Sequence, residues 1–170
     1  MTTHSAGPIT LGIDPGTATL GYGVIAGDTE PVAIDYGVIE TSPDAAMAVR
    51  LRDIHAGVCE LIERFHPTVV AVEQLFFARN VTTALTVGQA RGVILLAAAQ
   101  HDIVVTEYTP MQVKQAVVGY GAADKHQMQE MVRIILSLRS LPKPDDAADA
   151  LAIALCHAQS APFLARTGQA

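Results

Sequence analysis

An apolar run that ends on a carboxylate constrains this chain more than any other feature. Residues 9–13 have the length and residue types of a buried strand, and Asp14 follows them directly, before the turn-forming pair Pro15 and Gly16. This arrangement predicts that Asp14 is held rigidly at the edge of a sheet, where a metal ion or a phosphate can reach it. A second apolar run, residues 68–72, ends in the same way on Glu73.

Two further strand patterns follow within the first 40 residues. Residues 21–26 and 32–40 are rich in β-branched residues, and the polar segment 27–30 joins them as a turn. Because strands connected by short links usually pair with each other, residues 9–40 are expected to form an antiparallel meander.

Helical patterns alternate with two more strands in the rest of the chain. Ser42 is expected to cap a helix whose apolar residues recur at helical spacing, at Leu51, Ile54, Val58, Leu61 and Phe65. The remaining expected elements are strands at 68–73 and 103–107 and helices at 81–100, from Pro110, from Asp124 to about residue 138, and at 145–159. The order β-β-β-α-β-α-β-α predicts an α/β fold, a mixed five-stranded sheet with helices on both faces.

The size and composition of the chain predict one cytoplasmic domain. A single domain is expected over residues 1–170, with a core at about 9–158 and a loose tail over the last ten residues. The longest apolar run, residues 93–99, is far shorter than the ~20 residues that a membrane span needs, and no secretory signal pattern is visible. The only two cysteines, Cys59 and Cys156, lie in helical patterns without metal-ligand spacing.

The charges are distributed unevenly along the chain. The net charge is −6, and residues 1–63 contain nine acids but only two bases, Arg50 and Arg52. Residues 74–144 contain seven bases and four acids. Affinity for a polyanion depends on where the bases lie, so the acidic total weakens the case for a nucleic-acid partner without excluding it.

The segment 81–100 predicts a helix that is apolar on nearly all sides. Its few polar positions are chiefly Gln89, Arg91 and Gln100, and Gly88 and Gly92 lie one turn apart. A helix of this kind must be buried on more than one side. We expect one face to pack on the sheet and the other on a second subunit.

A third group of acids opens the last helical segment. Asp146 and Asp149 are three residues apart and Asp145 and Asp149 four apart, so either pair shares a helix face and spacing alone does not choose between them. Carboxylates of this kind favour Mg²⁺ or Mn²⁺ over zinc. With Asp14 and Glu73 they predict a site at which two metal ions could activate water and cleave a phosphodiester.

Several motifs in this order resemble the RuvC family of Holliday-junction resolvases, from about residue 9 to residue 158. They are GIDPG (12–16), LGYGV (20–24), VEQLFF (72–77), GQARG (88–92), QVKQ (112–115) and DAADALAI (146–153). The resemblance implies an RNase H-like fold, a homodimer, and Mg²⁺-dependent paired nicking of four-way DNA junctions in recombination and repair. It also implies work beside a branch-migration motor and a junction-binding protein.

The resemblance also assigns roles to residues of this chain. Asp14, Glu73, Asp146 and Asp149 become the catalytic, metal-binding acids. The expected DNA contacts are Phe76, Phe77, Arg79, Lys114 and Lys125. Cofactors are expected to be two Mg²⁺ ions per site, or Mn²⁺ in their place.

Three other functions fit parts of the sequence. The opening GIDPGT also suits the phosphate loop of actin-like ATPases, but these need a second such domain, for which the chain has no room. Cleavage of the RNA strand in RNA–DNA hybrids shares the fold and metals. A non-catalytic nucleic-acid-binding scaffold is the third, and the four acids argue against it.

Overall fold

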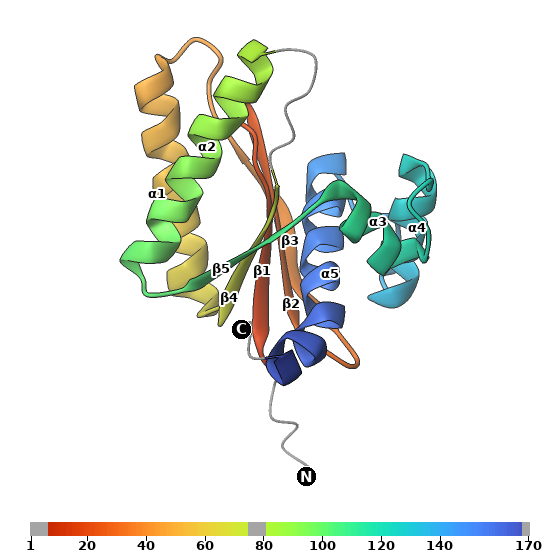
Figure 1. Ribbon diagram of the computed structural model, residues 1–170. Coiled ribbons are helices and arrows are strands. Elements are labelled where there is room, and N and C mark those ends of the chain that lie inside the picture. Colours follow the sequence, from red (N-terminus) through yellow and green to blue (C-terminus); the bar gives the residue numbers. More distant parts are fainter. Residues whose placement is uncertain (1–6, 75–80, 168–170) are drawn as a thin grey trace.

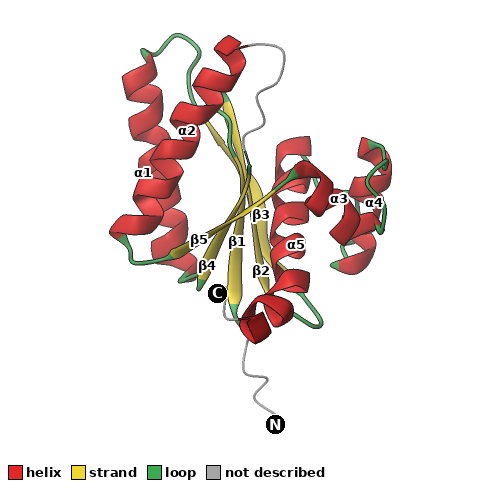
Figure 2. Ribbon diagram, viewed as in Figure 1, coloured by secondary structure: helices red, strands yellow, loops and turns green. Residues whose placement is uncertain are grey.

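The centre of the protein is a five-stranded mixed sheet. The computed structural model describes residues 7–74 and 81–167. The strands are β1 (Ile9–Asp14), β2 (Thr19–Ala26), β3 (Val32–Glu40), β4 (Val69–Glu73) and β5 (Val104–Tyr108) (Figures 1 and 2). They lie in the order β3-β2-β1-β4-β5, with β1, β2 and β3 antiparallel and β4 parallel to both β1 and β5. The predicted meander and mixed sheet are confirmed.

Parallel pairing brings two strand ends together. Ile13 at the end of β1 lies opposite Val72 of β4. Asp14 and Glu73 each follow these residues directly, so the two carboxylates lie side by side at one edge of the sheet.

Helices cover both faces of the sheet, as the element order predicts. On one face lie α1 (Met47–Phe65) and α2 (Val81–Gln100); on the other lies α5 (Asp145–Thr167), with α3 (Pro110–Val118) and α4 (Lys125–Ile135) packed against it (Figure 1). Alternation along the strands divides the core between the two faces. Val70 and Val72 of β4 pack with the α1 and α2 side, whereas Ala71 between them packs with α5.

Glycines let α5 lie unusually close to the sheet. A Cβ atom added to Gly12 of β1 would lie 2.2 Å from the carbonyl oxygen of Ala150. One added to Gly21 of β2 would lie 2.0 Å from that of Asp146, and one on Gly23 would lie 2.8 Å from Leu151. Side chains at these positions would push the helix away, so the three glycines set the distance between α5 and the strands β1 and β2.

Two helix boundaries differ from those predicted. The first helix begins at Met47 rather than behind Ser42, because the Ser42 hydroxyl accepts from the Asp44 amide at 3.3 Å in a local turn. The last helix continues to Thr167, with Pro162 inside it, so the expected end at residue 159 is wrong, and the expected tail is helical as far as Thr167. The predicted cap at Asp124 is confirmed, because its side chain accepts from the Gln127 amide at 2.8 Å.

Helix α2 leaves apolar side chains on its outer face. Val81 is 80% exposed, Leu85 63% and Leu96 52%. By length and composition alone the helix could cross a membrane, which is weak support for a membrane span, and 28% of its apolar window is buried. The guanidinium of Arg91 pairs with the carboxylate of Glu107, which ties α2 to β5.

Candidate active site

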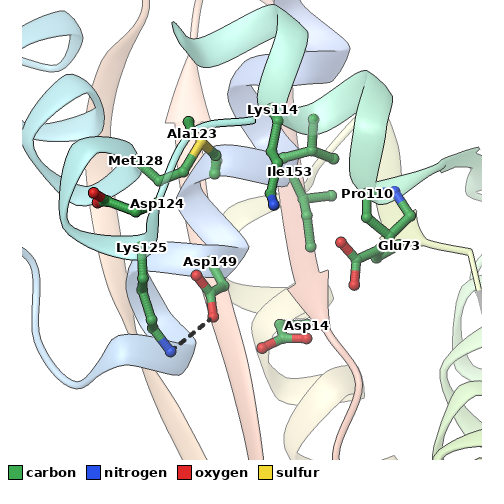
Figure 3. A pocket seen from close by; sticks show the side chains of 12 residues that line it. Asp14, Glu73, Pro110, Lys114, Ala123, Asp124, Lys125, Met128, Asp149 and Ile153 are labelled. Carbon is green, nitrogen blue, oxygen red and sulfur yellow. Dashed lines mark ion pairs between the residues drawn. The ribbon is translucent and has the colours of Figure 1, made fainter. Parts of the chain in front are cut away.

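The carboxylates at the sheet edge line a cavity of about 250 Å³ between the strands and the helices α3, α4 and α5. Asp14 comes from β1, Glu73 from β4 and Asp149 from the second turn of α5. Lys114 of α3 and Lys125 of α4 complete the charged lining. Figure 3 shows the three acids around the cavity and the two lysines beside them. Five predicted site residues, distant in sequence, therefore meet in one place.

Burial and mutual repulsion make Asp14 a weak acid. Its pKa rises from 3.8 to about 7, first because the carboxylate is desolvated and then because Asp149, Glu73 and Asp146 carry like charge nearby. Lys125 acts in the opposite direction. Strongly perturbed acids in a cavity are typical of functional sites.

The other two acids of the cavity are perturbed in the same direction. Burial and the charge of Asp149 raise the pKa of Glu73, against the lowering effect of Lys114. Burial, with the charges of Asp146 and Asp145, raises the pKa of Asp149, against the lowering effect of Lys125. Each of these carboxylates would gain from a neighbouring cation.

Asp145 and Asp146 occupy different places although they are neighbours in sequence. Asp146 does not line the cavity, but its charge contributes to the raised pKa of Asp14. Asp145 also lies outside the cavity lining, where its carboxylate accepts from Lys143 at 3.2 Å and from Gln129 at 2.9 Å. These donors lower the pKa of Asp145, with Lys143 the first of them. The geometry therefore separates the two residues that helical spacing leaves equivalent.

The donor set fits a hard divalent cation. In the described ranges, 7–74 and 81–167, no three His, Cys, Asp or Glu side chains converge on one point as a closed metal site. The cavity acids nevertheless repel one another strongly enough to raise each other's pKa. An open arrangement suits Mg²⁺, which binds through one or two carboxylates and keeps several waters or phosphate oxygens as ligands.

Three predicted DNA contacts cannot be placed. Phe76, Phe77 and Arg79 lie outside the described residues. Sequence reasoning also missed the supporting residues of the site. The sequence motifs contain the glycines opposite α5 but do not reveal their role in packing. The buried Gln129 is also not named among the predicted site residues, although a glutamine on the apolar face of a helix is a recognisable signal.

Comparison with known proteins identifies the family. The family model described as "Crossover junction endodeoxyribonuclease RuvC" matches residues 10–157. The RuvC protein of Roseiflexus sp. (strain RS-1) is 55% identical over 159 residues, which cover 92% of this chain and 94% of that protein. The protein of the same name from Chloroflexus aggregans is 58% identical, with 93% and 97% coverage.

Solved structures agree with this assignment. The structure of T. thermophilus RuvC in complex with Holliday junction substrate superposes with a TM-score of 0.84 at 42% identity, covering 91% of this chain and 96% of that one. The yeast mitochondrial Holliday junction resolvase Ydc2 has a TM-score of 0.64 at 16% identity, over 98% of this chain and 86% of that one, and so supports the fold alone. The predicted RNase H-like α/β fold is confirmed. This chain belongs to the crossover junction endodeoxyribonuclease RuvC family.

Proposed function

We propose that this protein is a structure-selective endonuclease that resolves four-way DNA junctions by paired, symmetric nicks during recombination and repair. The observation that carries this proposal is the meeting of Asp14, Glu73 and Asp149 with two lysines in one cavity, in a chain of the RuvC family. RuvC proteins are metal-dependent nucleases, and their name specifies cleavage within DNA at crossover junctions.

Asp14, Glu73, Asp146 and Asp149 are the residues that would hold the metal ions, which we propose to be two Mg²⁺ per site, with Mn²⁺ as a substitute. Such ions supply an activated water and stabilise the charge on the leaving oxygen. The carboxylates must lose their protons to bind a cation. A pKa of about 7 for Asp14 therefore makes the first cation compete with a proton near neutral pH.

The remaining residues of the cavity position the DNA strand. Lys114 and Lys125 line the cavity, where their ammonium groups can bind phosphate oxygens next to the scissile bond. Val113, Met128 and Ile153 form apolar parts of the wall. Because they exclude water, they strengthen the electrostatic interactions between the charged residues and the phosphate. Phe76, Phe77 and Arg79 are proposed as further DNA contacts.

Paired nicking requires two active sites, and we propose a homodimer formed through α2. The exposed side chains of Val81 and Leu85 and the open space around Gly92 support this choice. A two-fold dimer matches the symmetry of a four-way junction. We further propose a single cytoplasmic domain that works with a branch-migration motor and a junction-binding protein.

A side-by-side assay tests the function. Purified protein is incubated with Mg²⁺ and either a four-way junction, a linear duplex of the same sequence or an RNA–DNA hybrid. We expect symmetric nicks in the junction and little cleavage of the other two. Preferential cleavage of the hybrid would replace this proposal by RNase H-type activity, and absence of cleavage with retained junction binding would indicate a non-catalytic scaffold.

A further inference from the structure

The carboxylate of Asp145 lies at the centre of a polar cluster that joins α4 to the start of α5. Its Oδ1 accepts from the Gln129 side chain at 2.9 Å and from Lys143 Nζ at 3.2 Å. Its other oxygen, Oδ2, lies 3.3 Å from Lys125 Nζ. Two donors thus hold one oxygen of Asp145, and the second oxygen faces Lys125.

Gln129 fixes the orientation of this carboxylate. It is a polar residue that is only 5% exposed, one turn along α4 from Lys125. A buried amide needs a hydrogen-bond partner, and Asp145 supplies one. The position of Asp145 is therefore set by a buried contact, although its own side chain is 45% exposed.

The position of Lys125 is unfavourable for its helix and needs another explanation. It is the first residue of α4, directly after the cap Asp124, where the helix dipole repels a positive charge. Its ammonium also lies 3.6 Å from Asp149 Oδ2 at the cavity (Figure 3). A half-exposed ion pair adds little to stability, so the value of the Asp145 contact lies in where it holds the lysine.

We infer that Asp145 is a positioning residue for Lys125: its Oδ2 holds the Lys125 ammonium at the edge of the catalytic cavity, ready for the phosphate of the DNA strand. Asp145 lies outside the cavity lining, so it holds Lys125 without occupying a ligand position of the proposed metal site. Lys125 is 57% exposed on a flexible side chain, and without Asp145 it would keep only the longer, 3.6 Å contact with Asp149. This inference rests on the proposed nuclease function.

A double-mutant cycle on junction cleavage tests the inference. Asp145→Asn keeps an oxygen for Gln129 but loses the charge that faces Lys125. We expect kcat to fall by about 3- to 30-fold, which lies within the range of about 2- to 150-fold that coupled neighbouring residues give, with KM unchanged. In a Lys125→Ala background the same substitution should change kcat by less than about twofold. Asp145→Glu, which retains the charge, should recover most of the activity.

The matched control is Glu130→Gln. It removes one negative charge from α4, the helix that carries Lys125, and breaks a comparable ion pair, with Arg133 at 2.9 Å, which does not involve Lys125. We expect its kcat to match that of the wild type. Equal losses in Asp145→Asn with and without Lys125 would overturn the inference, because Asp145 would then act independently of the lysine.

A second readout does not depend on cleavage. In the metal-free protein, NMR relaxation of the Lys125 side-chain Cε group should show greater mobility in Asp145→Asn than in the wild type or in Glu130→Gln. Unchanged mobility would overturn the inference. If Asp145→Asn does not fold, Asp145→Glu is measured instead: it keeps the charge, so the mobility of Lys125 should equal that in the wild type, and greater mobility would overturn the inference. Wild-type protein that fails to cleave junctions would instead contradict the proposed function.

Discussion

At the scale of single residues, the four acids proposed to bind the metal ions carry the central prediction. Asp14→Asn, Glu73→Gln and Asp146→Asn should each reduce junction cleavage by at least roughly 100-fold, the upper end of what supporting residues around a metal cost. Asp149→Asn should be nearly as severe. Junction binding in EDTA should survive, because it rests mainly on phosphate contacts by bases elsewhere. Cleavage at the wild-type rate by any of these variants would show that the substituted residue does not belong to the site. Asp102→Asn, at an exposed acid elsewhere, is the control.

The raised pKa of Asp14 predicts how stability depends on pH. Between its ordinary value of 3.8 and about 7, the folded protein keeps a proton that the unfolded chain has lost. The free energy of unfolding in EDTA should therefore fall as the pH rises through this window.

Asp14→Asn removes the buried charge, so this variant should melt at a higher temperature than the wild type at pH 8 in EDTA, by about 2–4 °C for each kcal/mol of destabilisation that is relieved. Thermal melts at pH 5 and pH 8 check this, and Mg²⁺ should stabilise only the wild type. Equal pH dependence in both proteins would contradict it.

At the scale of elements, the approach of α5 to the sheet determines where its acids lie. A Cβ added to Gly21 would lie 2.0 Å from the Asp146 carbonyl oxygen, so helix or strand must move. We expect Gly21→Ala to lower both the melting temperature and the cleavage rate. Gly121→Ala is the control, because its new Cβ would lie 3.4 Å from Met111 Cγ, an acceptable contact. A Gly21→Ala variant with the melting temperature and activity of the wild type would contradict this steric argument, because α5 would then accommodate the added Cβ.

The lysines on α3 and α4 lead to a separate prediction about the salt dependence of junction binding. If Lys114 and Lys125 bind phosphates, each releases counterions when the junction binds. Lys114→Ala and Lys125→Ala should each reduce the slope of log affinity against log salt by about 1. Binding measured in EDTA across a salt series gives this slope. Unchanged slopes in both variants would place the phosphate contacts elsewhere, with Arg79 and Arg133 the next candidates.

At the scale of the whole molecule, α2 presents the surface that we propose to join two copies of the chain. Gly92→Glu would introduce a charge into this surface, where an added Cβ itself meets no atom within 4 Å in one protomer. We expect the wild type to sediment as a dimer at micromolar concentration and Gly92→Glu as a folded monomer that cleaves poorly. Ile134→Glu, at an apolar residue 55% exposed on α4, is the control and should remain dimeric. A wild-type protein that sediments as a monomer would contradict the proposed interface.

The sequence alone determined the order of the elements and most of the acids of the site. The runs before Asp14 and Glu73 are continuous and apolar, so their strands could be predicted from local pattern, and each acid from its place at a strand end. The motifs around Asp146 and Asp149 were equally local. The start of α1 and the end of α5 could not be predicted from local pattern. A turn at Ser42 competes closely with a helix start there, and a helix that continues through Pro162 competes closely with an end at residue 159.

Only the tertiary structure decided which of these acids share a cavity and what their charges do there. Asp145 and Asp146 are equivalent by helical spacing, but packing against α4 directs Asp145 to Gln129, Lys143 and Lys125. The pKa of Asp14 depends on burial and on charges from three other segments, none of them adjacent in sequence. Such effects act through space, between residues that the chain brings together only when it folds. Local sequence patterns carry no information about these distances.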